Sequence, residues 1–140
     1  MAPIKVVIIE DEPAAVDVII ELCQIAGNIQ VEAIASNGID ALELLKNVRT
    51  DLVFLDIDIP MMNGMEVLQH LQEQTFEIIF TTGSEEHTFK AYKFEALDYL
   101  LKPIDPVEFQ NALNKFRLKK ELTGQTLHEL ALTHKSGDQK

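Results

Sequence analysis

The sequence predicts an α/β fold in which a doubly wound sheet of five parallel strands carries helices on both faces. Five short apolar runs recur before residue 103, and segments with apolar residues at helical spacing lie between them. The runs are apolar at consecutive positions, which is typical of strands buried on both faces. This alternation favours a parallel sheet covered by helices, with 2-1-3-4-5 as the expected strand order.

The predicted strands share a length of about six residues and a high content of Val, Ile, Leu and Phe. Turn-forming or charged residues bound each run. Pro103 lies just beyond the fifth, where its missing N–H cannot interrupt the sheet. In chain order the predicted strands are Ile4–Ile9, Ile29–Ala35, Asp51–Asp56, Phe76–Thr82 and Ala96–Leu101.

The segments between the strands carry signals for the beginning and end of helices. Pro13 suits the first position of a helix, and Gly27 with the following Asn predicts the end of that helix. Asp105 can cap the last helix, which we expect to begin at Pro106 and run to about Lys120. The other predicted helices carry Ala41–Leu45, Met65–Leu71 and Glu85–Glu95.

Composition limits the classes of function that the chain can have. Its 140 residues have room for one domain and a short additional segment. A net charge of −11 argues against direct nucleic-acid binding and against docking on an anionic membrane, since both need clustered basic residues. There is no apolar run of roughly 18 residues and no signal-peptide pattern, so we expect a cytoplasmic protein. The single cysteine, Cys23, is expected to pack as a small hydrophobic residue.

Charged and hydroxyl side chains follow the predicted strands at their carboxyl ends. Glu10 and Asp11 follow the first strand, Asp56 ends the third, Thr82 ends the fourth and Lys102 follows the fifth. In doubly wound sheets, ligands bind outside the carboxyl ends of the strands, where the strand order reverses. Three carboxylates in one small site repel one another, and a hard divalent cation relieves the repulsion. The pattern therefore predicts a Mg²⁺ site.

The same side chains suit phosphoryl transfer. An aspartate such as Asp56 can attack a phosphoryl group and form an acyl phosphate. A metal ion, the Lys102 ammonium and the Thr82 hydroxyl can stabilise the charge on the transferred oxygens. Each acid taken singly could be a solvated loop residue or a helix cap, whereas the joint pattern favours a reactive site.

Four motifs stand at the predicted strand ends, and they are V-V-I-I-E-D-E-P, D-L-V-F-L-D-I-D-I-P-M-M-N-G, I-I-F-T-T-G and A-L-D-Y-L-L-K-P. Together they resemble the receiver domain of two-component response regulators, which has a CheY-like, flavodoxin-like fold. The resemblance extends from residue 4 to about residue 120. It implies a receiver domain over residues 1–120, and a linker or the start of a truncated C-terminal effector domain over residues 121–140.

The resemblance also implies a role for each residue of the acidic site. Asp56 corresponds to the phospho-acceptor, which receives its phosphoryl group from a sensor histidine kinase. Asp11 corresponds to a direct Mg²⁺ ligand, and Glu10 to a second acid that acts through water, at a position where receivers often have Asp. The backbone carbonyl of Asp58 corresponds to the third protein ligand of the metal. Such a domain is a signalling module with at most slow autodephosphorylation, not an enzyme.

Further residues correspond to the conformational switch of the family. The Thr82 hydroxyl moves towards the phosphoryl oxygen, Tyr99 is the aromatic switch residue, and Lys102 pairs with the phosphate. Gly83 stands where a small residue leaves room for the phosphoryl group, and the bond between Lys102 and Pro103 is often cis in this family. Phosphorylation is expected to alter the face formed by the fourth helix, fifth strand and fifth helix, through which a homodimer could form.

The segment K-A-Y-K-F-E-A-L-D-Y-L-L-K-P resembles receivers that precede LytTR-type DNA-binding domains. This implies that the output is transcription, through a DNA-binding domain absent from this segment. Residues Leu127–Thr133 are expected to form a strand that enters a turn, as if a further domain began there. A stand-alone receiver with a loose tail is the alternative.

Two other functions compete with the phosphorylated receiver. Val53–Asp58 also fits the D-x-D motif of haloacid-dehalogenase-type phosphatases, but in those enzymes the metal-binding acids follow this motif, whereas Glu10 and Asp11 precede it. A degenerate receiver that serves only as an interaction module is the other alternative, and the complete set of Asp11, Asp56, Thr82 and Lys102 argues against it.

Overall fold

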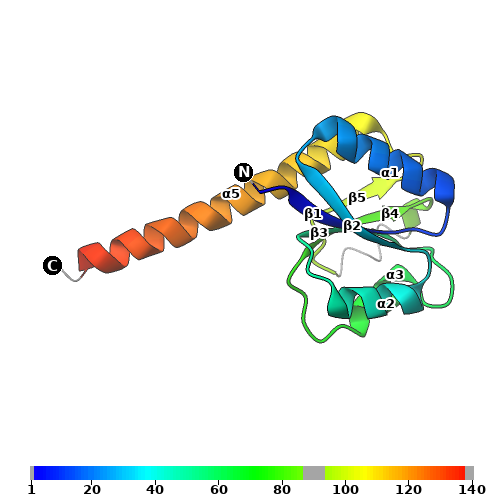
Figure 1. Cartoon of the computed structure of the whole chain (residues 1–140), viewed down its shortest axis with the longest axis horizontal. Coiled ribbons are helices and arrows are strands. Elements are labelled where there is room, and N and C mark those ends of the chain that lie inside the picture. Colours follow the sequence, from blue (N-terminus) through cyan, green and yellow to red (C-terminus); the bar gives the residue numbers. More distant parts are fainter. Residues whose placement is uncertain (1, 87–93, 138–140) are drawn as a thin grey trace.

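The structure is a computed structural model that describes residues 2–86 and 94–137. Its centre is one sheet of five parallel strands in the order β2-β1-β3-β4-β5, with helices on both faces (Figure 1). This arrangement confirms the predicted fold class and strand order. The elements are β1 (Ile4–Ile9), α1 (Pro13–Ala26), β2 (Ile29–Ala35), α2 (Gly38–Asn47), β3 (Leu52–Asp56), α3 (Gly64–Gln69), β4 (Glu77–Thr82), β5 (Asp98–Leu101) and α5 (Pro106–Gly137).

The strands lie where the apolar runs predict them, with small differences at their amino ends. β1 and β2 have the predicted bounds, whereas the other three begin one or two residues later. Asp51 stands just before β3, and its carboxylate accepts a hydrogen bond from the backbone N–H of Lys5 at 2.9 Å. The helix predicted over Glu85–Glu95 falls largely on residues 87–93, which lie outside the described residues.

Alternate residues of the central strands fill two hydrophobic cores. On one face, Val53 and Leu55 of β3 pack with residues of α2 and α3. On the other face, Phe54 packs with residues of α1 and α5, and its ring stacks on that of Phe109 at 5.3 Å between centroids. Cys23 lies in this second core, as predicted, and burial raises the pKa of its thiol to about 12. The thiol is therefore protonated and unreactive in the folded protein.

The last helix is longer than the sequence predicts. α5 continues past Lys120 to Gly137, so both the predicted end of the helix and the predicted strand over Leu127–Thr133 are wrong. The segment after Lys120 has Leu, Glu, Gln and Ala, which favour helix, and a helix satisfies its backbone hydrogen bonds without a partner strand. Figure 1 shows α5 projecting beyond the sheet. Within the described parts of the chain, no helix combines the length and apolarity of a membrane span.

Gly38, the first residue of α2, lies against the loop that follows β3. Its backbone N–H donates to the carbonyl of Pro60 at 3.1 Å, and a Cβ atom on Gly38 would lie 2.0 Å from the carbonyl oxygen of Met62. Because both partners are backbone, neither can move aside cheaply. The glycine therefore allows α2 to hold the loop that carries Asp58.

The substitution Gly38→Ala should lower the free energy of unfolding by about 3 kcal/mol, near the upper end of the usual cost of overpacking. Chemical denaturation measures this quantity. Gly83→Ala is the matched control, because a Cβ on Gly83 meets no described atom within 4 Å and its φ is not in the left-handed region. Equal effects of the two substitutions would show that the contact between Gly38 and the loop does not matter.

Candidate functional site

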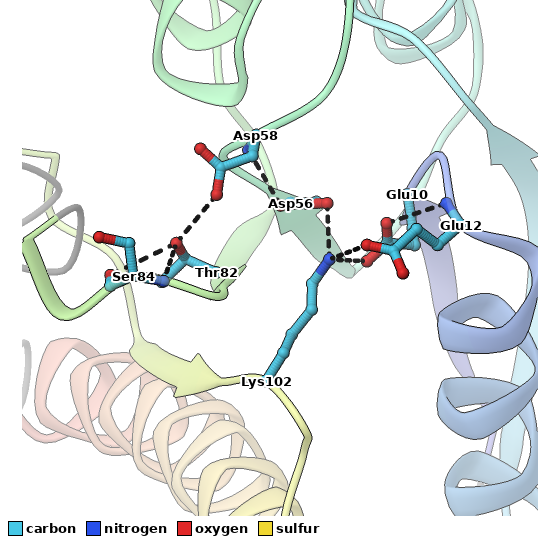
Figure 2. A network of polar contacts seen from close by, with 7 residues as sticks. All are labelled: Glu10, Glu12, Asp56, Asp58, Thr82, Ser84 and Lys102. Carbon is cyan, nitrogen blue, oxygen red and sulfur yellow. Dashed lines mark hydrogen bonds and ion pairs between the residues drawn. The ribbon is translucent and has the colours of Figure 1, made fainter.

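The carboxyl ends of β1, β3, β4 and β5 meet at one edge of the sheet and bring the predicted site residues together. Backbone hydrogen bonds fix these ends, including that from Lys102 N–H to the carbonyl of Thr82 at 2.8 Å. Figure 2 shows the side chains of Glu10, Asp56, Thr82 and Lys102 gathered there, with Asp58 above them. The sheet topology thus places residues that are far apart in sequence around one small volume.

Three carboxylates form the acidic part of the site. One oxygen atom from each of Glu10, Asp11 and Asp56 lies within 4.8 Å of the others. Glu10 and Asp56 are each only 1% exposed, whereas Asp11 is exposed. A divalent cation bound here would have carboxylate oxygens as ligands on the buried side of the site and water molecules on the exposed side.

Lys102 is the counter-charge to the two buried acids. Its Nζ lies 2.6 Å from Oε1 of Glu10 and 2.8 Å from Oδ2 of Asp56, and 3.7 Å from Oε1 of the more exposed Glu12. Burial alone lowers the pKa of Lys102, but hydrogen bonds and charges from Asp56 and Glu10 outweigh it and raise this pKa above its usual value. The peptide bond between Lys102 and Pro103 is cis, as the family resemblance implies.

The positive charge of Lys102 does not fully balance the negative charges of the carboxylates around it. Burial, together with hydrogen bonding and charge from Asp56, raises the pKa of Glu10 to about 7, although Lys102 and the backbone N–H of Glu12 act in the opposite direction. The apo site therefore carries more negative charge than its surroundings stabilise. An added cation would lower this electrostatic cost, so the residues present fit the predicted Mg²⁺.

The loop after β3 turns back over Asp56. The backbone N–H of Asp58 donates to Oδ1 of Asp56 at 2.9 Å. A cap of α3 by Asn63 holds the far end of this loop, because the Asn63 side chain accepts from the backbone N–H of Glu66 and the Glu66 side chain accepts from that of Asn63. Asp56 thus has one carboxylate oxygen on the loop backbone and the other on Lys102. A metal contact of the Asp58 carbonyl stays a prediction.

Thr82 is fully buried at the end of β4, and its hydroxyl is hydrogen bonded to the loop acid. The Thr82 Oγ1 donates to Oδ2 of Asp58 at 3.2 Å, or to the carbonyl of Ser84 at 3.4 Å, and accepts from the backbone N–H of Ser84 at 3.1 Å. The sequence pattern places Thr82 near the site but does not reveal this contact. It also misses Glu12, whose position beside Asp11 is the signal that could have found it.

Tyr99, the predicted aromatic switch residue, lies on β5, and β4 separates it from β3 and Asp56. It pairs with Phe80 in the register of β4 and β5, and the two rings stack with centroids 6.0 Å apart. The Tyr99 side chain is half-buried. The structure thus places Tyr99 next to the strand that carries Thr82 but not among the carboxylates, and its role stays a prediction.

A cavity of about 570 Å³ opens over the acids. Its polar part is formed by Asp11, Asp56, Asp58 and Lys102, with Gly83 at the rim. Residues of α1 and the two residues that follow Lys102 supply an apolar wall that the sequence pattern did not single out, consisting of Ala14, Ala15, Val18, Pro103 and Ile104. This volume is large enough for a phosphoryl group together with a hydrated cation.

Comparison with known proteins identifies the class that this fold and site define. The chain matches the family model of the response regulator receiver domain over residues 6–114. It therefore belongs to that family and is the receiver domain of a response regulator in two-component signalling. Receivers of this family are signalling domains that histidine kinases phosphorylate and are not typical enzymes, so membership argues against the phosphatase alternative.

Curated relatives are longer response regulators, and the matched region covers about half of each. The chain is 35% identical over 115 residues to the transcriptional regulatory protein BtsR of Escherichia coli K12, which covers 81% of the chain and 48% of BtsR. It is 37% identical over 103 residues to an uncharacterized response regulatory protein of Vibrio cholerae, covering 73% and 44%. The chain thus spans about half the length of the curated relatives it matches.

Solved receiver structures have the same fold. The response regulatory domain of protein mrkE from Klebsiella pneumoniae superposes with a TM-score of 0.78 at 32% identity, covering 85% of this chain and 99% of that one. The REC domain of AraT from Geobacillus stearothermophilus gives the same TM-score and identity, covering 89% and 99%.

Proposed function

We propose that this receiver domain accepts one phosphoryl group on Asp56 in a Mg²⁺-dependent reaction and changes conformation as a result. The observation that carries the proposal is the contact of buried Asp56 with Lys102 beside two further acids. The phosphodonor would be the phosphohistidine of a sensor kinase. Glu10, Asp11, Asp56 and the backbone carbonyl of Asp58 would hold the ion, which when bound supplies positive charge at the transferred oxygens.

The chain's own residues account for the other parts of the reaction. A carboxylate oxygen of Asp56 forms a bond to phosphorus while the bond between phosphorus and the donor nitrogen breaks, and the electron pair leaves with the imidazole. No general base is required, because a carboxylate nucleophile has no proton to lose, and Lys102 donates to its Oδ2. Lys102 then neutralises part of the charge of the phosphoryl group.

The conformational response would run through β4 and β5. The Thr82 hydroxyl would donate to a phosphoryl oxygen, and Tyr99, which stacks on Phe80 of the same strand as Thr82, would change its packing. This change would alter the face made by residues after β4, β5 and the start of α5, where a homodimer could form. Residues 87–93 of this face lie outside the described residues.

We propose further that the output is transcriptional. The name of the BtsR relatives, transcriptional regulatory protein, and the resemblance of the segment before Pro103 to receivers of LytTR-type regulators support this. DNA binding would belong to a domain outside this segment, because the segment itself carries a net charge of −11. The cytoplasmic location stays a prediction.

Incubation with acetyl phosphate tests the function. With Mg²⁺ at millimolar concentration, intact-protein mass spectrometry should show the gain of one phosphoryl group, and excess EDTA should prevent this gain. A protein that gains no mass under either condition is not a phosphorylatable receiver but the interaction-only alternative. Continuous release of inorganic phosphate from a phosphate monoester would instead indicate an enzyme.

Mg²⁺ binding alone should stabilise the fold. At an ion concentration about 100 times the dissociation constant, the free energy of unfolding should rise by about 2.7 kcal/mol, because the ion binds only the folded state. Thermal denaturation with and without Mg²⁺ measures the rise. Asp11→Asn should remove most of it, whereas Asp17→Asn, which changes an exposed acid elsewhere on α1, should leave it intact.

A further inference from the structure

The side chain of Asp58 has a specific contact that the proposed chemistry does not use. Asp58 follows Asp56 by two residues, and its carboxylate, although the residue is exposed, points across the site to Thr82 at the end of β4 (Figure 2). There its Oδ2 accepts the hydrogen bond of the Thr82 hydroxyl at 3.2 Å. The backbone N–H of the same residue donates to Oδ1 of Asp56 at 2.9 Å. Asp58 is thus bonded both to the proposed phospho-acceptor and to the proposed switch hydroxyl.

The Thr82 hydroxyl has one proton and can donate it to one acceptor at a time. Its acceptors in this structure include the Asp58 carboxylate at 3.2 Å and the Ser84 carbonyl at 3.4 Å. A charged acceptor forms the stronger bond, so the carboxylate is preferred. Thr82 cannot donate to a phosphoryl oxygen on Asp56 until it releases Asp58.

The position of Asp58 depends in turn on Asp56. Its N–H is hydrogen bonded to a carboxylate oxygen of Asp56, and phosphorylation would convert that carboxylate into an acyl phosphate, a mixed anhydride with weaker acceptor oxygens. The loop that carries the Asp58 carboxylate would lose part of its anchor at the moment when Thr82 acquires a new acceptor. Both changes favour transfer of the Thr82 proton from Asp58 to the phosphoryl group.

We infer that Asp58 is a positioning residue that holds the Thr82 hydroxyl in the unphosphorylated arrangement and so opposes activation. The inference rests on the proposed function, because it needs a phosphoryl group at Asp56. It assigns a role to the carboxylate of Asp58 that is separate from that of its backbone carbonyl. Removal of this carboxylate should favour the phosphorylated conformation, and it should do so only where Thr82 has a hydroxyl.

A double-mutant cycle with beryllofluoride, a stable mimic of the phosphoryl group, tests the inference at saturating Mg²⁺. Calorimetric titration gives the dissociation constant of beryllofluoride for the wild-type protein, Asp58→Ala, Thr82→Val and the double variant. We expect Asp58→Ala to tighten binding about fivefold when Thr82 is present, the low end of typical coupling between sites. In the Thr82→Val background the same substitution should change binding by less than about twofold.

Two further variants separate this coupling from charge and from folding. Thr82→Ser keeps a hydroxyl, so Asp58→Ala should again tighten binding in that background. Glu12→Gln also removes one negative charge near Lys102, but Glu12 lies on the opposite side of Lys102 from Thr82 (Figure 2). The effect of Glu12→Gln on beryllofluoride binding should therefore be the same whether residue 82 is Thr or Val.

The outcomes distinguish the inference from the function on which it rests. If Asp58→Ala changes binding equally in the Thr82 and Val backgrounds, or not at all, the inference is overturned while the proposed function stands. If the wild-type protein does not bind beryllofluoride, or Asp56→Asn binds it as well as wild type does, both are overturned.

Discussion

Asp56→Asn should abolish the gain of phosphoryl mass from acetyl phosphate, the largest effect expected of any single substitution in this protein. The amide is a poor nucleophile, so the acyl phosphate cannot form. The fold should persist, because Asn preserves the shape of the side chain and its oxygen can still accept the N–H of Asp58. Intact mass spectrometry with Mg²⁺ measures the gain, and circular dichroism confirms folding.

The matched control for this substitution is Asp17→Asn. Asp17 is an exposed acid on α1, and the control protein should gain phosphoryl mass as fast as wild type. Peptide mapping should place the modification of both proteins on the segment that contains Asp56. A phosphoryl group that persists in Asp56→Asn would mean that another side chain is the acceptor.

Lys102→Met should destabilise the apo protein strongly, because it leaves Glu10 and Asp56 buried without their counter-charge. Loss of one partner from a buried ion pair costs about 3–5 kcal/mol, and the partial exposure of Lys102 places the expected loss at the lower end, about 3 kcal/mol near pH 8. Chemical denaturation measures the loss. Lys115→Met is the control, since Lys115 pairs with Asp98 at the surface and should change stability by less than about 0.5 kcal/mol.

The loss caused by Lys102→Met should depend on pH. The pKa of Glu10 is already raised to about 7, and removal of the ammonium raises it further. A carboxyl whose folded pKa exceeds its unfolded value binds more protons in the folded state, so stability falls as pH rises above about 4.5. The free energy of unfolding of the variant should therefore be closest to that of the wild type near pH 5 and furthest below it near pH 8. Mg²⁺ should restore part of the lost free energy of unfolding at pH 8. If neither lower pH nor Mg²⁺ restores stability, lost packing and not lost charge is the cause.

The strand positions were predictable because a parallel strand buried on both faces has apolar residues at consecutive positions. The strand order followed from the doubly wound fold class that this alternation of strands and helices indicates. β1 is apolar along Val6–Ile9, and all four residues are fully buried. The end of α5 was not predictable in this way. Leu127–Thr133 has an apolar content compatible with a strand, whereas its Leu, Glu and Ala residues and the absence of a pairing partner among the described residues favour helix.

The acidic site was predictable from topology, whereas its hydrogen bonds were not. Once Glu10, Asp56 and Lys102 are assigned to the carboxyl ends of β1, β3 and β5, the parallel sheet itself brings them to one edge. The bond between Thr82 and Asp58 depends on the path of a loop, which Gly64 shapes by its close approach to the backbone of Asp56. Loop paths follow from such tertiary contacts, so sequence periodicity carries no information about them.

α5 runs away from the acidic site, so its far end and the acidic site lie at opposite ends of the domain. The helix begins after β5, at the edge that carries Lys102, and passes Ile4 at the opposite edge, where Phe116 and Lys120 lie beside the N-terminal segment (Figure 1). A phosphodonor protein over the acids and any body attached to the far end of α5 would approach from opposite poles. Their contacts with this domain would therefore lie on separate surfaces. Communication between them would then require a free-energy coupling through the sheet, not competition for space.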